Sequence, residues 1–454
     1  MHVVGIGGTG LSAIARVLWE RGETVSGSDL TTNAQVEALR KDGVTISVGH
    51  DPANVAGADL VLVSSAIAPD NPEVVAASGA GIPVVRREAF LGELTAGLRT
   101  VAVAGTHGKT TTTALIAWLL QQAGLKPGFV LGGVSVDFGR NAAAGGGSHF
   151  VIEADEYDRA FLGLHPSVAV VTNLEYDHPD LFPTADAYRE AFEAFVERVE
   201  DRLIVCREDE GARRLTRRGV DRESYGLTSE ADWYAEEIRP NAAGGSDFLA
   251  FRRSTSLGLI RTRLPGVHNV MNVLGALAAV DVFAVPVATA RQALTEFRGV
   301  ERRFTVVGEV GQVAVIDDYG HHPTEIRATL AAVRSRFPGR EVWAVFQPHT
   351  FSRTRALSSA FAQAFDDADH VVVTEIFASR ERPEPGVDSA WLVQQINHAD
   401  VHHATTLEGA AGIVLDGLEA PAVVVTLSAG DGHRVGAMVV EALTHGREGK
   451  GDER

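Results

Sequence analysis

Residues 101–113 read Val-Ala-Val-Ala-Gly-Thr-His-Gly-Lys-Thr-Thr-Thr-Thr, an apolar strand that runs through a turn between two glycines into a helix. Gly105 and Gly108 let the backbone N–H groups of the turn point at one anion, and Lys109 adds a positive charge. Thr110 offers a hydroxyl to Mg²⁺ at the start of the helix. The pattern predicts a loop that binds the phosphates of ATP or GTP. Its candidate nucleotide-binding residues are Gly105, Thr106, His107, Gly108, Lys109, Thr110 and Thr111.

A structural glycine turn with a surface lysine is the alternative interpretation of this loop. The loop is shorter than the general pattern G-x-x-x-x-G-K-[ST], which would require glycine in place of Val103. Lysine occurs only at positions 41, 109, 126 and 450, and arginine supplies the positive charge elsewhere. The compact ammonium in this turn therefore favours phosphate binding.

Length and composition indicate a soluble protein of several domains. The chain has 454 residues, of which 45% are hydrophobic and 22% charged, and about three domains fit this length. Each would be large enough to bury its own core. We predict domains at 1–95, 96–299 and 300–454. The tail 446–454 is expected to be disordered because of its polar composition.

Short apolar runs alternate with helical stretches along the chain, which predicts an α/β fold with doubly wound parallel sheets. In the first domain we expect strands at 2–6, 24–27, 44–47, 60–64 and 82–85. In the second we expect strands from residue 100, at 150–153 and at 168–173, then a strand-rich stretch at 223–263 and a helix that extends to about 284. In the third we expect strands at 313–316, 342–346, 371–374 and 422–427.

Charge and cysteine content exclude several classes of function. A formal net charge of −18 disfavours nucleic acid and anionic membranes as partners, because both attract basic surfaces. No apolar run is long enough for membrane insertion, and Met1 leads into an apolar strand without a basic signal segment, so we expect a cytoplasmic protein. The single cysteine, Cys206, excludes an intramolecular disulfide and a multi-cysteine zinc site. No obligate protein partner is indicated.

A second glycine loop, at residues 5–10, lies between the first expected strand and the first helix and matches G-x-G-x-x-G. Asp29 ends the second strand, at the distance typical of a ribose-binding acid. Ser64 and Ser65 follow a later strand and would face the same crevice. The loop predicts a site for a diphosphate-bearing nucleotide; a structural turn and a capping serine pair are the alternatives. The candidate residues are Gly7, Gly8, Thr9, Gly10, Asp29, Ser64 and Ser65.

Two strands of the second domain are followed by acidic side chains. Glu153 ends the first of these strands, and His178 is the only imidazole in the loop after the second. Mg²⁺ prefers one or two hard oxygen ligands together with phosphate oxygens and water. We therefore predict a metal site at Thr110, Glu153 and His178, and we interpret Asp158 and Asp180 as solvated loop acids.

The third domain concentrates titratable side chains on one turn, Asp317-Asp-Tyr-Gly-His-His-Pro-Thr-Glu325. Tyr319 and His321 are its candidate site residues, and a helix start with a histidine pair is the alternative. After the next strand, Arg353 and Arg355 offer guanidinium groups that can clasp a carboxylate or a γ-phosphate. A solvated basic face is the alternative there.

In this order the motifs resemble those of the Mur ligases. They are H-x-x-G-I-G-G-T-G, A-G-T-H-G-K-T-T-T-T, E-A-D-E, T-N-x-x-x-D-H, G-x-H-N-x-x-N, D-D-Y-G-H-H-P-T-E and F-Q-P-H-x-x-x-R-T-R, and they span residues 2 to about 355. The resemblance implies a Rossmann-like N-terminal domain for a UDP-sugar and a central P-loop-type ATPase domain. It also implies a Rossmann-like C-terminal ligase domain that closes over ATP and brings the amino acid.

The resemblance is closest to the alanine-adding branch of the family. It implies that ATP activates the lactyl carboxylate of UDP-N-acetylmuramic acid to an acyl phosphate, which the amine of L-alanine attacks, in peptidoglycan precursor synthesis. ATP and Mg²⁺ are the implied cofactors. Asn269 falls where the family holds adenine, beside His268, and Arg303 falls where an arginine reaches ATP. The implied catalytic residues are Lys109, His178, His321 and Arg353, with Tyr319 and Arg355 at the alanine and acyl-phosphate site.

Two features of the sequence bear on which branch of the Mur ligase family the chain resembles. Several sister ligases carry a carbamylated lysine that helps to hold a second Mg²⁺, but this chain has no lysine between 127 and 449. In lacking this lysine the chain resembles the alanine-adding branch. Tyr157 is shared with the murein tripeptide recycling ligase, which is the first alternative, and the segment around Ser428 departs from the family pattern. An NAD-dependent dehydrogenase and a non-catalytic nucleotide-binding protein are the alternatives from other classes.

Overall fold

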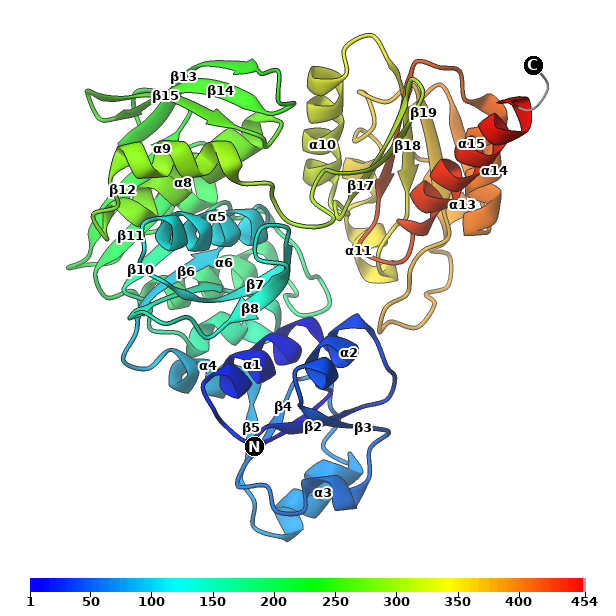
Figure 1. Ribbon diagram of the computed structural model, residues 1–454. Coiled ribbons are helices and arrows are strands. Elements are labelled where there is room, and N and C mark those ends of the chain that lie inside the picture. The colour runs from blue at the N-terminus through cyan, green and yellow to red at the C-terminus, as the bar shows by residue number, and fades with distance from the viewer. Residues whose placement is uncertain (452–454) are drawn as a thin grey trace.

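Three β-sheets organise the chain, each built from a consecutive part of the sequence (Figure 1). The computed structural model describes residues 1–451. We call the parts built on these sheets the N-terminal, central and C-terminal domains. In Figure 1 the N-terminal domain lies below the other two, which stand side by side. The α/β class agrees with the sequence, and the exact domain boundaries remain predictions.

The N-terminal domain is a parallel sheet of five strands in the order β3-β2-β1-β4-β5. The strand order reverses between β1 and β4, so a crevice opens at the carboxyl end of β1, where the first glycine loop begins. The elements are β1 His2–Val4, α1 Thr9–Glu20, β2 Ser26–Asp29, α2 Ala34–Lys41, β3 Thr45–Val48, the short helix η1 Pro52–Val55, β4 Val61–Val63, α3 Pro72–Gly79, β5 Val84–Arg86 and α4 Arg87–Thr95.

The central domain has a ten-stranded sheet in the order β15-β14-β13-β12-β11-β10-β6-β9-β7-β8. Strand β6 lies inside this sheet between parallel neighbours, and its apolar residues Val101 and Val103 are fully buried. The phosphate loop therefore starts at the end of a buried strand inside the sheet. The strands are β6 Arg99–Ala104, β7 Gly128–Ser135, β8 Arg140–Ala143, β9 His149–Glu153, β10 Val168–Val171, β11 Arg202–Cys206, β12 Asp221–Gly226, β13 Trp233–Pro240, β14 Ser246–Arg252 and β15 Thr255–Thr262. The helices are α5 Lys109–Gln122, η2 Tyr157–Gly163, α6 Ala185–Val196, α7 Glu210–Arg214, α8 Val267–Asp281 and α9 Val287–Glu296.

The C-terminal domain has a six-stranded sheet in the order β16-β17-β21-β18-β19-β20, which is parallel except for the edge strand β16. The strands are β16 Thr305–Val310, β17 Val313–Asp318, β18 Glu341–Phe346, β19 His370–Thr374, β20 Val401–Ala404 and β21 Ala422–Leu427. The helices are α10 Pro323–Arg336, α11 Phe351–Ala356, α12 Ser358–Phe361, α13 Ser389–Val393, α14 Leu407–Gly417 and α15 Arg434–Gly451.

The structure differs from the sequence expectations in its edge strands and in its tail, and it also shows how the cores are joined. Strands β7, β8, β16 and β20 were not expected, because β7 is rich in glycine and the other three are edge strands with little apolar pattern. Buried residues of the N-terminal and central domains form one continuous cluster, and a smaller cluster lies within the N-terminal domain alone. In the tail predicted to be disordered, helix α15 continues to Gly451, and residues 452–454 lie outside the described part.

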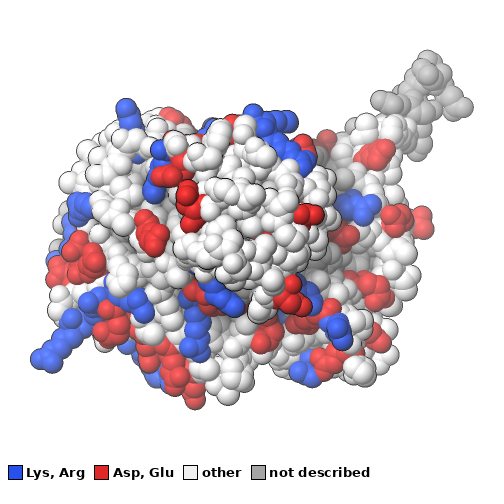
Figure 2. Space-filling view, turned by 90° about the horizontal axis from the view of Figure 1, so that it is seen from below, with Lys and Arg blue, Asp and Glu red and all other residues white. Residues whose placement is uncertain are grey.

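Acidic and basic side chains are interspersed on the face of the molecule that Figure 2 shows from below. Within residues 1–451, no helix has both the length and the apolar character needed to span a bilayer.

Candidate functional site

The phosphate loop between β6 and α5 has a backbone that requires glycine at two positions. Gly105 has a φ of +131° and Gly108 a φ of +78°. A Cβ atom would lie 2.0 Å from Thr172 Oγ1 at the first position and 2.6 Å from Asn272 Oδ1 at the second. Tight packing against both neighbours therefore fixes the curled backbone that suits a phosphate.

Lys109 is the first residue of α5, and its side chain folds back over the loop. Its Nζ donates to Gly105 O at 2.6 Å and to Thr106 O at 3.2 Å, and it lies 2.8 Å from Glu156 Oε2. Burial alone would lower the pKa of Lys109, but the carboxylates of Glu156 and Glu153 raise it above its usual value. The loop therefore holds a charged ammonium at its centre.

Two cavities adjoin the phosphate loop. The larger, of about 530 Å³, is lined by all three domains, and we call it the junction cavity. The smaller, of about 320 Å³, lies between the central and C-terminal domains, and we call it the interdomain cavity. His107, Gly108, Val300, Arg303 and Glu325 line both. A ligand held by the loop can therefore extend into the interdomain cavity while its other end faces the junction cavity.

Most of the predicted site residues line one of these cavities. The junction cavity is lined by Thr9, Gly10, Thr106, Lys109, Thr110, Glu153, His178, Tyr319, His321 and Arg353. Thr111, His268 and Asn269 line the interdomain cavity. The candidates that line neither are Gly7, Gly8, Asp29, Ser64, Ser65, Gly105 and Arg355.

The three predicted metal ligands lie in the same cavity as Lys109. Thr110 supplies a hydroxyl, Glu153 a carboxylate and His178 an imidazole, and all three line the junction cavity. Glu153 Oε2 accepts a hydrogen bond from Gly132 N at 2.8 Å. Burial raises the pKa of Glu153 even though Lys109 opposes the shift. A cation would stabilise the ionised carboxylate, and phosphate oxygens and water would complete a magnesium shell.

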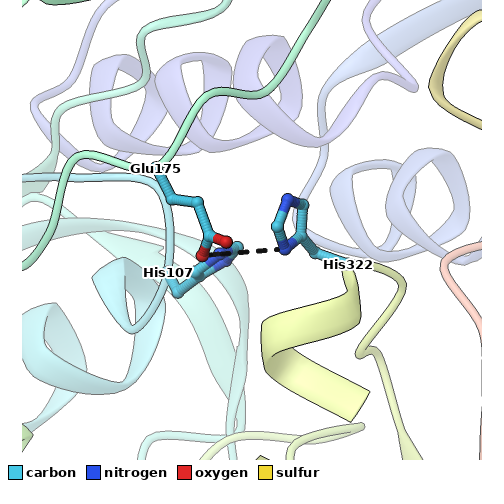
Figure 3. A group of neighbouring side chains, drawn as sticks. All are labelled: His107, Glu175 and His322. Carbon is cyan, nitrogen blue, oxygen red and sulfur yellow. Dashed lines mark hydrogen bonds and ion pairs between the residues drawn. The ribbon is translucent and has the colours of Figure 1, made fainter. Parts of the chain in front are cut away.

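His107, Glu175 and His322 meet between the central and C-terminal domains, with ligand atoms within 4.8 Å of one another (Figure 3). His107 Nε2 lies 3.1 Å from Glu175 Oε2, and its Nδ1 lies 3.3 Å from Glu325 Oε1. Burial alone would lower the pKa of His107, but these two carboxylates raise it to about 9. The positive charge of the protonated ring thus accounts for the closeness of His107 to the two carboxylates. Thr324 Oγ1 also donates to Glu175 Oε1 at 2.7 Å, across the same interface.

The C-terminal side of the junction cavity carries a neutral imidazole, His321, and a charged guanidinium, Arg303. Burial and the nearby guanidinium of Arg353 lower the pKa of His321 to about 3, so its ring is neutral. Its Nδ1 lies 3.0 Å from Tyr319 O, and donation there leaves Nε2 as an acceptor. The Arg303 guanidinium lies 5.0 Å from the centre of the Tyr319 ring and 3.5 Å from Glu325 Oε1.

The first glycine loop faces the junction cavity through Thr9 and Gly10. Asp29 does not reach that cavity, because its Oδ2 accepts a hydrogen bond from Gly7 N at 2.8 Å. Ser65 Oγ donates to the Asp158 carboxylate and so ties the N-terminal domain to the central one. Ser64 lies just before it, at the end of β4.

Sequence reasoning missed four residues that shape the site. Glu175 and Asp177 lie in the motif T-N-x-x-x-D-H, and Glu325 ends the motif D-D-Y-G-H-H-P-T-E. Their acidic side chains within these motifs were the available signal. Arg87 opens α4, where its Nη2 lies 3.0 Å from Asp155 Oδ2, and no local pattern distinguishes it. It lines the junction cavity from the N-terminal side.

Ser428 has a structural role in the segment that departs from the family pattern. Its Oγ donates to Gln347 Oε1 at 2.7 Å and accepts from Gly430 N at 3.0 Å. Gln347 Oε1 also accepts from Gly432 N at 2.8 Å. The buried serine and glutamine thus hold the turn after β21 against β18.

The fold and the site together define a three-domain α/β enzyme built around a nucleotide-phosphate loop. Three family patterns match the chain in sequence. They are "Mur ligase family, catalytic domain" at residues 1–99, "Mur ligase middle domain" at 103–280 and "Mur ligase, glutamate ligase domain" at 302–430. The chain belongs to the Mur ligase family of ADP-forming ligases.

Relatives within the family are similar over nearly their whole length. The UDP-N-acetylmuramate–L-alanine ligase of Roseiflexus sp. (strain RS-1) is 45% identical, with 97% of this chain and 98% of the relative covered. That of Chloroflexus aggregans is 43% identical over the same shares. The crystal structure of the UDP-N-acetylmuramate-alanine ligase MurC from Thermotoga maritima has a TM-score of 0.82 at 29% identity, covering 98% and 99% of the two chains. A murein peptide ligase from Psychrobacter arcticus has a TM-score of 0.70 at 28% identity, covering 97% and 98%.

Proposed function

We propose that this chain uses ATP to join L-alanine to the lactyl carboxylate of UDP-N-acetylmuramic acid, as a step of peptidoglycan precursor synthesis. The names of its relatives support the two substrates, since chains 40–45% identical over 87–98% of this one are called UDP-N-acetylmuramate–L-alanine ligases. The family is ATP-dependent, and ADP and phosphate are the expected by-products.

The observation that carries the proposal is the meeting of three domains at one cavity beside the phosphate loop. A ligation of this kind must bring two anions, the triphosphate and the lactyl carboxylate, within bonding distance. The junction cavity is lined by the first glycine loop, the phosphate loop and the C-terminal turn that carries Tyr319 and His321. Each of the three reactants would thus reach the cavity from a different domain.

We assign the nucleotide to the phosphate loop and the interdomain cavity. The loop N–H groups and Lys109 would hold the phosphates and reduce their repulsion of an incoming carboxylate. Asn269 and His268 would lie at the adenine, and Arg303 would reach the phosphates from the C-terminal domain. Burial lowers the pKa of His268 to about 4, so this ring is neutral. A neutral ring beside an uncharged base leaves no buried charge unpaired.

Thr110, Glu153 and His178 would hold Mg²⁺, which when bound supplies charge stabilisation to the transferring phosphoryl group. Lys109 would stay on the phosphate throughout and keep the acyl phosphate oriented. His321, neutral and with Nε2 free to accept, would receive a hydrogen bond from the amine of L-alanine and orient it for attack. Closure of the C-terminal domain over the cavity would exclude water from the activated carboxylate.

The test is phosphate release with ATP, Mg²⁺ and UDP-N-acetylmuramic acid, in separate reactions with L-alanine or with L-Ala-γ-D-Glu-diaminopimelate. We expect release with L-alanine. Release with the tripeptide alone would assign the chain to the recycling branch. Release with neither acceptor would contradict the proposal.

A further inference from the structure

The hydroxyl of Tyr188, on helix α6, is buried beside the phosphate loop, although it lies 82 positions from Thr106 in the sequence. The side chain is 2% exposed and lines neither the junction cavity nor the interdomain cavity. Its OH lies 2.9 Å from Thr106 Oγ1, within the loop, and 3.3 Å from Glu156 Oε1, after the end of β9. The hydroxyl therefore joins two segments of the site without facing either cavity itself.

Thr106 and Glu156 compete for the one proton of this hydroxyl. Thr106 Oγ1 donates to Glu175 O at 2.8 Å and accepts from Glu175 N at 2.9 Å. Since the proton of the Thr106 hydroxyl is used on Glu175 O, the contact between Thr106 and Tyr188 needs the proton of Tyr188. The Glu156 carboxylate needs the same proton, because a carboxylate can only accept. Tyr188 can therefore donate to one of these two groups at a time.

Glu156 is the buried counter-ion of Lys109. Its side chain is 1% exposed, and its two oxygens lie 2.8 Å and 3.1 Å from Lys109 Nζ. In the proposed function the same ammonium binds the phosphates of ATP. When Lys109 turns toward the phosphates, the Glu156 carboxylate stays buried and loses part of its compensation. A buried carboxylate without a partner is strongly unfavourable, so binding of ATP requires a second donor for Glu156.

Apart from Lys109, the side-chain donors next to the Glu156 carboxylate among residues 1–451 are Tyr188 OH and His178 Nε2. His178 Nε2 lies 3.6 Å from Oε1, which is too far for a hydrogen bond, and His178 is itself a predicted ligand of Mg²⁺. Burial and the Glu156 carboxylate raise the pKa of Tyr188 well above its usual value. The phenol therefore keeps its proton and is the donor available to Glu156.

We propose that Tyr188 is a positioning residue for nucleotide binding, whose hydroxyl donates to Glu156 when Lys109 turns to the phosphates of ATP. The proposal rests on the proposed function, because it requires that the phosphate loop holds ATP. While Lys109 contacts Glu156, as in the structure, the shorter contact of the hydroxyl is with Thr106. A small rotation of the O–H bond would move the proton to Glu156. Lys109 can then leave Glu156 without leaving a buried carboxylate unsatisfied.

The test is the Kd for ATP of Tyr188→Phe, measured by calorimetry with Mg²⁺ and without L-alanine. Phenylalanine keeps the ring and removes only the hydroxyl. We expect the Kd for ATP to rise about tenfold, because the bound state loses a hydrogen bond to a charged group. The Kd for UDP-N-acetylmuramic acid should stay within about twofold. Tyr176→Phe is the matched control, because the Tyr176 hydroxyl donates to Phe182 O at 2.7 Å in the same aromatic cluster and contacts neither Thr106 nor Glu156.

Glu156→Gln tests whether the hydroxyl acts through the carboxylate. An uncharged amide depends much less on a second donor when Lys109 leaves, so adding Tyr188→Phe to Glu156→Gln should change the Kd for ATP by less than about twofold. An unchanged Kd in Tyr188→Phe alone would overturn the proposal. An equal rise in the Glu156→Gln background or in Tyr176→Phe would also overturn it, since the effect would then come from packing. Failure of the wild type to bind ATP would instead overturn the proposed function.

Discussion

Arg353 of the C-terminal domain and Asp177 of the central domain form an ion pair across the domain interface, with side chains only 5% and 6% exposed. Burial alone would raise the pKa of Asp177, but the Arg353 guanidinium holds it well below its usual range. The pair therefore stays charged at neutral pH. It ties the loop that carries His178 to the helix that follows β18.

Breaking this pair should cost catalysis. Asp177→Asn leaves a buried guanidinium without its counter-charge, which costs about 3–5 kcal/mol in comparable buried pairs. We expect kcat for phosphate release to fall more than tenfold as the closed arrangement becomes less favourable. Asp186→Asn is the control, because Asp186 is 73% exposed and pairs with Arg189 on the surface. Equal activity of the two variants would show that the buried pair does not hold the domains together.

Lys109→Ala should abolish ligation and spare binding of the sugar nucleotide. The ammonium lies in the phosphate loop, while the first glycine loop belongs to another domain. We expect phosphate release to fall by about 10² or more, with the Kd for UDP-N-acetylmuramic acid, measured by calorimetry, within about threefold of wild type. Lys126→Ala, at an exposed lysine, should change neither. A parallel loss of both would contradict the separation of the two sites.

Two glycines with the same backbone angle test how closely the phosphate loop is packed. Gly108 and Gly124 have φ values of +78° and +79°. A Cβ at Gly108 would lie 2.6 Å from Asn272 Oδ1, whereas nothing lies within 4 Å of one at Gly124. Alanine at either position carries the left-handed backbone cost of about 1–2 kcal/mol. Only Gly108→Ala should also weaken binding of ATP, measured by equilibrium dialysis, and equal affinities in both variants would contradict this account.

The charge on His107 should stabilise the closed protein at low pH. Its pKa is raised from about 6.5 in the unfolded chain to about 9 in the folded one. Stability from the imidazolium is therefore fully present below about pH 6.5 and is lost as the pH rises through about 9. The Tm advantage of the wild type over His107→Gln, by scanning calorimetry, should be about 2–4 °C at pH 6 and should vanish near pH 10. A constant difference across this range would assign the effect to packing.

Local sequence signals were sufficient to name many of the residues that line the two cavities of the candidate site. Gly105, Gly108 and Lys109 stand at a strand-to-helix junction, where the residue types themselves specify a phosphate loop. Glu153 could be predicted because the carboxyl ends of parallel strands meet at one edge of the sheet. The glycine-rich strand β7 could not be predicted, because its own residues have low β propensity and it forms by pairing with β9 in the folded sheet.

Contacts between domains lay beyond the reach of the sequence. The partner of Arg353 is 176 positions away, and the motif that contains Asp177 does not indicate that this residue pairs with Arg353. Arg355, two residues on, fits the same motif but lies on the exposed face of α11 with Glu384. Which of two neighbouring arginines turns inward depends on the packing of the helix, and the motif contains no information about that packing.

In the proposed reaction the lactyl carboxylate is activated by phosphoryl transfer before L-alanine attacks it. The most direct measurement uses UDP-N-acetylmuramic acid labelled with ¹⁸O in that carboxylate, together with ATP, Mg²⁺ and L-alanine, and follows the label by ³¹P NMR. We expect that each phosphate released carries one ¹⁸O atom and that an equal amount of alanylated sugar nucleotide forms. Phosphate without the label, released as the product forms, would contradict activation of the carboxylate by phosphoryl transfer.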